Sequence, residues 1–374
     1  MIHADVLAYF ADDPTRSYQL IQWLPVLEQL DQHHAVAIVA RDERTVEVLR
    51  ERTHLPIAFV PGFAEMTDFY AASDAKVVLY CNNSMLNFNS LLDARKLHVH
   101  INHGESDKHS MASNNAKAYD RVFVAGEAAV QRYVLELLEL DTAKLVRIGR
   151  PQLDLRPPAL LEPSERRTVL YAPTWEGDAE YNDYTSVDTV GPDVVRAVLE
   201  VPDVRLVYKP HPKVTTSRSP QIVEGHRRIL ELIEAAGAPH QAITTGDILA
   251  VMPGCDAMIT DVSSVGLDWL YLRTDKPIFI TDRHHDADRL RLEVPVSRCA
   301  DVLAEVDVAG LAELVAARLA HDEHHLARVA MRHHYFDDHQ VGDSTARFTE
   351  AVSELVALRD RLVGGGAAEE AITA

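Results

Sequence analysis

The feature that most constrains the fold of this chain is a regular alternation of short apolar runs with longer stretches of helical periodicity. Strands that alternate with helices in this way pair in parallel and are covered by helices on both faces of the sheet. In the first half we expect helices that include residues 17–30, 42–52 and 127–138, and strands at 6–9, 35–39, 57–60, 77–79, 97–101, 121–124 and 145–148.

A proline-rich stretch between Pro151 and Pro163 interrupts this series and is typical of a linker. A second series follows it, with helices near 192–199, 222–236, 247–252, 264–272 and 310–319, and strands at 169–172, 204–208, 242–244, 257–260 and 277–280. A chain of 374 residues is long enough for two cores. We therefore predict an α/β protein of two Rossmann-like domains whose parallel sheets face a central cleft. The expected segments are 1–155, 165–345, a last helix at 346–363 and a disordered tail at 364–374.

The composition narrows the function. A formal net charge of −20 argues against a nucleic-acid-binding protein, which needs a basic surface. Cys81, Cys255 and Cys299 are far apart and indicate a reducing compartment without disulfides. The N-terminus has no signal-peptide pattern, and no apolar run approaches the ~20 residues that cross a bilayer. We expect a cytoplasmic protein, and peripheral attachment to the inner face of the cell membrane stays open.

The first candidate site is the segment 259–264. An apolar strand ends there in Thr260 and Asp261, and Ser263 and Ser264 precede an apolar helix. The N-terminus of a helix binds anions, because its unpaired N–H groups and its dipole both point at the ligand. The simpler interpretation of Ser263, taken alone, is an N-cap.

The second candidate is the segment 209–212, where Lys209 and His211 alternate with prolines after the predicted strand 204–208. Open α/β sheets bind ligands at this end of a strand, and the prolines stiffen the backbone there. A lysine and a histidine suit a diphosphate, although a surface turn would also explain them. Thr174 and Trp175 follow the strand 169–172 and form the third candidate, for which a strand-end turn with a packing tryptophan is the alternative.

The fourth candidate is His103, followed by Gly104, after the predicted strand 97–101. Gly104 would let the backbone turn tightly, and a histidine at a strand end can act as a base near neutral pH. His98, His100 and His103 also form a string that suggests metal ligands. No acidic partner stands at a matching spacing, so we expect no metal.

Taken together, these motifs follow one order along the chain. They are His-Gly-x3-Lys at 103–108, Gly-x-Pro-x2-Asp at 149–154, Tyr-Ala-Pro-Thr-Trp at 171–175, Lys-Pro-His-Pro at 209–212, and Thr-Asp-x-Ser-Ser-x3-Asp-x7-Lys-Pro at 260–277. This order closely resembles the CDP-glycerol glycerophosphotransferase family, the teichoic-acid primases and polymerases, over residues 95–350. A Gly-Asp-Ser-Thr string at 342–345 looks like the family's C-terminal element.

The resemblance implies a GT-B fold and transfer of glycerol phosphate, or a similar polyol phosphate, from a CDP-activated donor, with release of CMP and without a cofactor. His103 would then activate the acceptor hydroxyl, while Lys209 and His211 would hold the donor phosphates and stabilise their charge. The remaining donor-side residues would be Ser263 and Ser264 at the helix N-terminus, Asp261 ordering the turn, and Thr174 and Trp175 lining the donor side.

The acceptor side departs from the family's pattern. The family usually has His-Gly-Thr-Pro-Leu-Lys, whereas this chain has Glu105 and Asp107 ahead of Lys108. Acids repel a phosphate but can bind polyol hydroxyls. We expect Gly104, Glu105, Asp107 and Lys108 to meet a polyol-phosphate, glycan or lipid-linked acceptor in teichoic-acid-like or capsular polymer synthesis.

Two other functions stay open. One is a GT-B glycosyltransferase that uses a nucleotide sugar, because a fold does not fix the donor. The other is a non-catalytic member that binds nucleotide or polymer within a wall-synthesis complex. The intact His103, Lys209 and His211 argue against the second.

Overall fold

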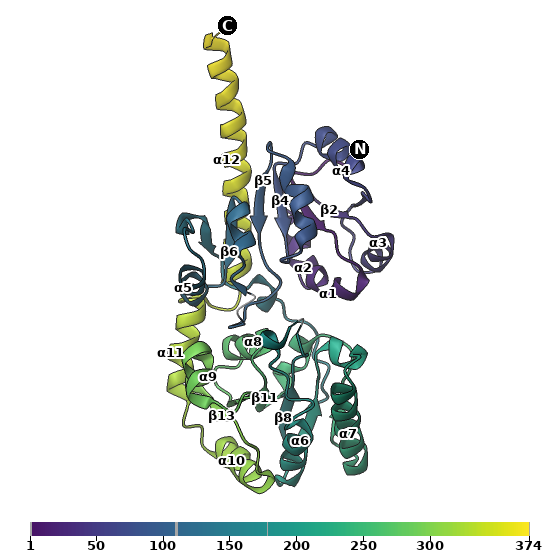
Figure 1. The fold of residues 1–374 in the computed structure, drawn as a ribbon, viewed down its shortest axis with the longest axis vertical. Coiled ribbons are helices and arrows are strands. Elements are labelled where there is room, and N and C mark those ends of the chain that lie inside the picture. The colour runs from purple at the N-terminus through teal and green to yellow at the C-terminus, as the bar shows by residue number, and fades with distance from the viewer. Residues whose placement is uncertain (1, 109–110, 178, 374) are drawn as a thin grey trace. The chain divides into compact units, whose positions relative to one another are not determined.

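The computed structural model describes residues 2–108, 111–177 and 179–373, and the chain forms two compact units (Figure 1). Unit 1 consists of Met1–Glu105, Ala112–Leu155 and Tyr335–Ala374. Unit 2 consists of Ser106–Met111 and Arg156–His334. None of the helices in the described part of the chain combines the length and the apolar character that a membrane crossing requires.

Unit 1 contains a seven-stranded parallel sheet in the order β3-β2-β1-β4-β5-β6-β7. The strands are β1 (Val6–Phe10), β2 (Val36–Ala40), β3 (Ile57–Phe59), β4 (Val77–Tyr80), β5 (Leu97–His100), β6 (Arg121–Val124) and β7 (Leu145–Arg147). The helices that accompany them are α1 (Tyr18–Ile21), α2 (Leu24–Leu30), α3 (Glu43–Arg50), α4 (Phe63–Ala72) and α5 (Glu127–Glu136).

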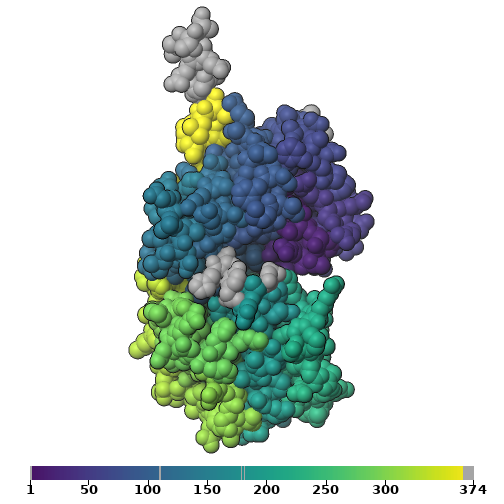
Figure 2. Space-filling model, in the orientation of Figure 1, coloured from purple at the N-terminus to yellow at the C-terminus, as the bar shows by residue number. Residues whose placement is uncertain are grey.

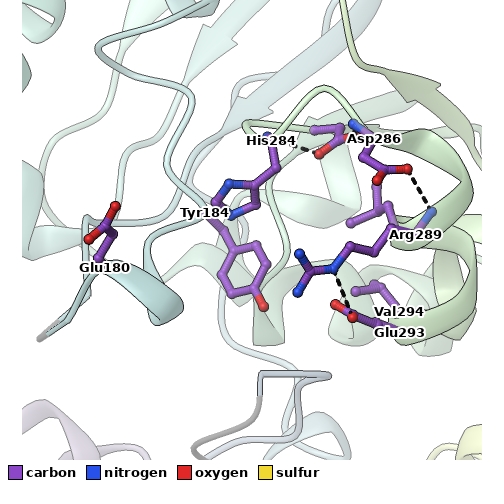
Figure 3. A pocket seen from close by; sticks show the side chains of 9 residues that line it. Glu180, Tyr184, His284, Asp286, Arg289, Glu293 and Val294 are labelled. Atoms are coloured by element: carbon purple, nitrogen blue, oxygen red, sulfur yellow. Dashed lines mark hydrogen bonds and ion pairs between the residues drawn. The ribbon is translucent and has the colours of Figure 1, made fainter.

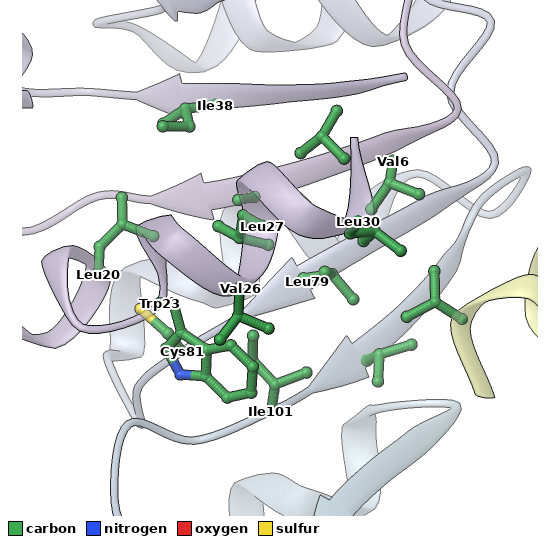
Figure 4. Close-up of a cluster of buried hydrophobic side chains, with 14 of the residues drawn as sticks. Val6, Leu20, Trp23, Val26, Leu27, Leu30, Ile38, Leu79, Cys81 and Ile101 are labelled. Atoms are coloured by element: carbon green, nitrogen blue, oxygen red, sulfur yellow. The ribbon is translucent and has the colours of Figure 1, made fainter. Parts of the chain in front are cut away.

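Both faces of this sheet are buried, which explains why the central strands β1, β2 and β4 are apolar at every position. Val6 and Phe10 of β1 belong to one core cluster, together with Trp23. Leu7 and Tyr9, which point to the opposite face, belong to another. Figure 4 shows the first cluster, in which side chains of the α2 region, including Trp23, lie against the strands.

Unit 2 contains a six-stranded parallel sheet in the order β10-β9-β8-β11-β12-β13. The strands are β8 (Arg167–Ala172), β9 (Val204–Tyr208), β10 (Gln241–Ala242), β11 (Ala257–Thr260), β12 (Ile278–Thr281) and β13 (Asp301–Leu303). Its helices are α6 (Gly191–Glu200), α7 (Pro220–Ala236), α8 (Ser264–Leu272), α9 (Ala287–Glu293), α10 (Val308–Ala320) and α11 (His325–Phe336), the last of which runs on into unit 1.

The predicted pair of parallel α/β folds is confirmed, with local differences. The helix expected at 17–30 is divided into α1 and α2, because Pro25 is tolerated only in the first turn of a helix. The helix expected at 247–252 is instead two 3-10 turns, Ile248–Ala250 and Met252–Gly254. The short strand β13 was not predicted, since three residues carry little periodic signal.

The last helix, α12 (Asp343–Thr373), belongs to unit 1, where its yellow residues lie beside blue ones in Figure 2. Phe348 and Val352 are buried in the core cluster that contains Trp23. The sequence predicts the second domain to extend to 345 and this helix to end at 363, whereas unit 2 ends at His334 and α12 continues to Thr373.

The motif at 149–154 meets the string at 342–345 where α12 begins. The carboxylate of Asp154 accepts hydrogen bonds from the backbone N–H groups of Gly342 and Thr345, both at 2.6 Å. Ser344 Oγ accepts one from the N–H of Arg150 at 3.0 Å. Gly149 has φ +76°, and a Cβ there would lie 2.2 Å from Ser344 Oγ, so only glycine fits. The two motifs therefore fasten the C-terminal helix to unit 1.

Replacing Asp154 with alanine should remove this cap and destabilise unit 1 by about 2 kcal/mol, because a carboxylate at a helix N-terminus satisfies otherwise unpaired N–H groups. Urea unfolding followed by circular dichroism measures the change in the free energy of unfolding. The control is Asp360→Ala on α12, which breaks exposed ion pairs with Lys76 and Arg359 and should cost under ~1 kcal/mol. Equal losses for the two variants would contradict the assigned role of Asp154.

Candidate functional site

Three of the predicted motifs meet at one edge of the unit 2 sheet. The strand β8 pairs with β9 on one side and with β11 on the other, so the strand order reverses at β8. Loops leaving the carboxyl ends of strands on either side of such a reversal diverge and form a ligand-binding crevice. Thr174 follows β8, Lys209 follows β9 and Ser263 follows β11. The topology therefore brings the predicted donor-side residues to one place.

Asp261 connects these loops through hydrogen bonds to its carboxylate. Its side chain is fully buried and accepts hydrogen bonds from the N–H of Thr174 at 2.7 Å and of Ser186 at 3.2 Å. The hydroxyl of Thr281, at the end of β12, donates a third at 2.5 Å. Burial raises the pKa of Asp261 to about 6, although these hydrogen bonds oppose the shift. Asp261 thus organises the loops and has no surface with which to touch a ligand.

The N-terminus of α8 has free donors for an anion. Ser263 occupies the N-cap position, but its side chain makes no capping hydrogen bond, so the simple N-cap interpretation does not hold. Its Oγ lies 3.4 Å from Thr260 Oγ1. No acid stands in the first turn of α8. The first N–H groups of the helix and the hydroxyls of Ser263 and Ser264 can therefore bind an anionic group.

Lys209 places a buried cation at the same sheet edge. The residue is only 4% exposed, and burial lowers the pKa of its ammonium group. Within the ranges that the structure describes, this ammonium makes no ion pair and no hydrogen bond to another side chain. A buried charge is costly unless an opposite charge compensates it. The lysine is thus set up for an anionic ligand.

His211 is held in one tautomer next to Lys209. Its Nδ1 accepts a hydrogen bond from the N–H of Lys213 at 3.2 Å, which puts the proton of the neutral ring on Nε2. The ring of Trp175 lies 6.1 Å from that of His211, and the ammonium of Lys213 lies 3.4 Å from the centre of the Trp175 ring. Lys213 is a cation that the sequence interpretation missed, although it directly follows the motif at 209–212.

In unit 1, His103 follows β5 in a tightly fixed turn. Asn102 has φ +50°, a conformation that asparagine tolerates better than most residues. Its Oδ1 accepts a hydrogen bond from the N–H of His103 at 2.9 Å, and its carbonyl accepts one from the indole of Trp23. The ring of Tyr18 meets that of His103 edge-on at 6.0 Å. Backbone, side chain and ring are therefore all held in place.

The other histidines of the string at 98–103 lie in the core of unit 1. His98 bonds through its two ring nitrogens to the hydroxyl of Tyr80 and the carbonyl of Asp93, both at 2.7 Å. His100 packs on Tyr119, and burial lowers its pKa to about 4. Across the described residues, no group of three His, Cys, Asp or Glu side chains is arranged to hold a metal ion.

The predicted acceptor-side residues divide between the two units. Gly104 and Glu105 belong to unit 1, and Glu105 is 5% exposed and forms an ion pair with Arg132. This pairing compensates the acid whose charge appeared unfavourable for a phosphate. Asp107 and Lys108 belong to a segment of unit 2 instead, where the Lys108 ammonium lies 5.6 Å from the centre of the Tyr184 ring.

The raised pKa of Asp261 predicts an unusual pH dependence. A carboxyl whose folded pKa is about 6, against an ordinary 3.8, stabilises the fold fully below pH 3.8. That contribution, about 3 kcal/mol, is lost as the pH rises to 6. Asn fits the same space and does not titrate. The melting temperature of Asp261→Asn minus that of the wild type should therefore rise between pH 4 and pH 7.

The control for this titration is Asp13→Asn. Hydrogen bonds from Thr15 lower the pKa of Asp13, so the same difference in melting temperature should be small and change in the opposite direction. A difference for Asp261→Asn that is independent of pH would show that the folded carboxyl titrates near its ordinary value.

Solved structures similar to this chain share its two-domain fold. A provisionally assigned UDP-N-acetylglucosamine 2-epimerase from Listeria monocytogenes is 15% identical, with TM-score 0.62, over 94% of this chain and 96% of that one. A glycosyltransferase from Rickettsia africae is 14% identical, with TM-score 0.56, over 95% and 99%. The wall teichoic acid polymerase TagF is 13% identical, with TM-score 0.59, over 95% and 89%. At these identities the likeness establishes the GT-B fold alone.

Comparison of the sequence with known proteins and families identifies more than the fold. No curated protein compared with it gives a significant match. The family model described as CDP-glycerol:poly(glycerophosphate) glycerophosphotransferase matches residues 96–291, which include His103, Lys209, His211 and Ser263. Since this match spans more than half of the 374 residues, the chain belongs to the CDP-glycerol:poly(glycerophosphate) glycerophosphotransferase family and is a transferase.

Proposed function

We propose that this protein transfers glycerol phosphate, or a similar polyol phosphate, from a CDP-activated donor to an acceptor hydroxyl. The observation that carries the proposal is the buried cation of Lys209, which forms no ion pair among the described residues and lies at the end of the sheet where α8 begins. Two features that favour a negative partner follow the two strands that flank β8, which suits a diphosphate.

On the donor side, each group has a separate role. Lys209 supplies a full positive charge, and His211 supplies a directed Nε2–H donor because its Nδ1 is already bonded. Ser263, Ser264 and the first N–H groups of α8 complete a set of fixed donors. Donors that are held before the substrate arrives stabilise developing phosphate charge without reorganising.

On the acceptor side, His103 is the proposed base. The acceptor oxygen attacks the donor's β-phosphorus, which carries the polyol, and His103 takes the hydroxyl proton. The bond from this phosphorus to the bridging oxygen breaks, and CMP leaves with that oxygen and its electron pair. The fixed turn at Asn102 supports this role, because a base must be held in a productive orientation.

The biological setting is proposed from the family. A polyol-phosphate transferase of this kind acts in the synthesis of teichoic-acid-like or capsular polymers, with a polyol-phosphate, glycan or lipid-linked acceptor. Such a protein would work at the inner face of the cell membrane as a peripheral protein. A nucleotide-sugar donor is the competing possibility, and comparing CDP-glycerol with UDP-sugars in a binding assay separates the two.

Replacing Lys209 with methionine should weaken CMP and CDP-glycerol binding by about 10- to 100-fold, because a hydrogen bond to a charged group is lost. The melting temperature of the free protein should stay the same or rise, since an uncompensated buried charge is removed. Titration calorimetry measures the affinity. Arg227→Met, which removes an exposed cation of α7 paired with Glu224 and Glu231, is the control and should bind both nucleotides normally. Normal affinity in Lys209→Met would refute the donor site.

Replacing His103 with alanine should leave donor binding intact and reduce turnover by about 10²- to 10⁴-fold, the range expected for loss of a general base. Release of CMP from CDP-glycerol in the presence of acceptor measures turnover, and calorimetry measures donor affinity. His54→Ala, which changes an exposed histidine of the same unit, should retain full activity. If His103→Ala turned over normally, His103 would not be the base.

A further inference from the structure

Unit 2 contains a pocket next to the phosphate-binding loops that the proposed function does not yet use. It has a volume of about 430 Å³ and lies beside the end of β12 and the helix α9 (Figure 3). We name it the Tyr184 pocket; its wall is formed by Glu180, Tyr184, Asp282, His284, Asp286, Arg289, Leu290, Glu293 and Val294.

The pocket is joined directly to the phosphate-binding loops. Asp282 follows Thr281, whose hydroxyl bonds to Asp261, and Tyr184 stands two residues before Ser186, whose N–H bonds to the same carboxylate. Arg283 fastens the two walls together, because its guanidinium donates to the carbonyl of Thr185 at 2.8 Å and to the carboxylate of Asp188 at 2.5 Å. A group in the pocket would therefore lie close to a phosphate bound at α8.

Tyr184 has a hydroxyl without a partner in the protein. The residue is 8% exposed, and in the parts of the chain that the structure describes its phenol forms no hydrogen bond. Burial raises the pKa of this phenol, so it stays protonated and can both donate and accept. In Figure 3 the ring stands between His284 on one side and Arg289 with Glu293 on the other. A hydroxyl with no protein partner at the wall of a pocket can bond to water or to a ligand.

The charges on the wall limit what can bind. Four carboxylates face one guanidinium, that of Arg289, so a phosphate would be repelled. The carboxylate of Asp282 already accepts hydrogen bonds from protein groups, the N–H of His284 at 3.0 Å and the N–H of Asp286 at 2.6 Å. Asp286 caps α9 through Arg289 N, and Arg289 Nε pairs with Glu293 at 2.9 Å. The remaining groups include both donors and acceptors.

Hydroxyl groups match such a wall better than an ammonium does. A hydroxyl donates to a carboxylate oxygen and accepts from a guanidinium or a phenol, so each can meet two wall groups. The excess of carboxylates would attract an ammonium, but an ammonium only donates and leaves the N–H groups of Arg289 without an acceptor. We propose that the Tyr184 pocket binds the uncharged, hydroxyl-rich unit attached to a phosphate held at the α8 N-terminus.

This inference rests on the proposed function and specifies its substrate. The hydroxyl-rich unit has two sources with the same chemistry, the polyol of the nucleotide donor and the terminal polyol of the acceptor. The polyol of the donor would bind as part of the nucleotide molecule, whereas the terminal polyol of the acceptor would bind independently of the nucleotide. Binding measurements with matched probes distinguish them.

The test measures the affinities of CMP, CDP-glycerol and, in the presence of CMP, glycerol 3-phosphate by calorimetry. The variants are Tyr184→Phe and Glu293→Gln, with Glu231→Gln on α7 as the control for removing a carboxylate from unit 2. Melting temperatures confirm that each variant is folded. Tyr184→Phe should weaken the hydroxyl-bearing ligand about 3- to 10-fold, the effect of one lost hydrogen bond, and leave CMP unchanged.

Each result has a distinct meaning. A loss confined to CDP-glycerol supports the pocket and assigns it to the donor polyol, whereas a loss confined to glycerol 3-phosphate supports it and assigns it to the acceptor. Unchanged affinities in both variants, or an equal loss for CMP, would overturn the inference while leaving the donor site intact. A wild type that bound neither CMP nor CDP-glycerol would overturn the proposed function, and this inference with it.

Discussion

The arrangement of the donor side depends on one buried carboxylate. Asp261 accepts hydrogen bonds from residues that follow β8 and end β12, while it follows β11 itself. Removing a carboxylate from water is costly, and three donors from separate segments offset only part of that cost, the most when all of them are in place. The carboxylate therefore favours one conformation of these loops, which presents Thr174, Ser263 and the wall of the Tyr184 pocket together.

This arrangement separates charge over a short distance within unit 2. Lys209, His211 and the α8 N-terminus offer positive character, whereas the Tyr184 pocket carries an excess of carboxylates. A ligand with a negative diphosphate and a neutral polyol has one favourable orientation in such a field, because reversing it would bring phosphate against the acids. In a chain of net charge −20, the few cations of this edge also locate the phosphate.

The sequence predicts the parts of this site that depend on local pattern. Apolar strands ending in polar residues identified Lys209, His211 and Ser263, since the carboxyl ends of parallel strands share an edge. Features that depend on distant partners escaped prediction. Glu105 is neutralised by Arg132, 27 positions away, and Asp107 and Lys108 leave unit 1 although Glu105 does not. The two walls of the Tyr184 pocket come from strand ends about a hundred residues apart in sequence, and no local spacing connects them.

The proposed base is connected to the far end of the chain by direct contacts. Phe348 of α12 packs on Trp23 with ring centres 5.2 Å apart, and the Trp23 indole donates to the carbonyl of Asn102, which precedes His103. Unit 1 is thus completed by a helix that follows all of unit 2 in the sequence. Unit 2, in contrast, is formed mostly by one continuous segment, residues 156–334. Long-range closure of this kind slows folding, because the entropy of joining distant segments must be met before their contacts form. The packing of the turn that holds His103 therefore depends on residues from both ends of the chain.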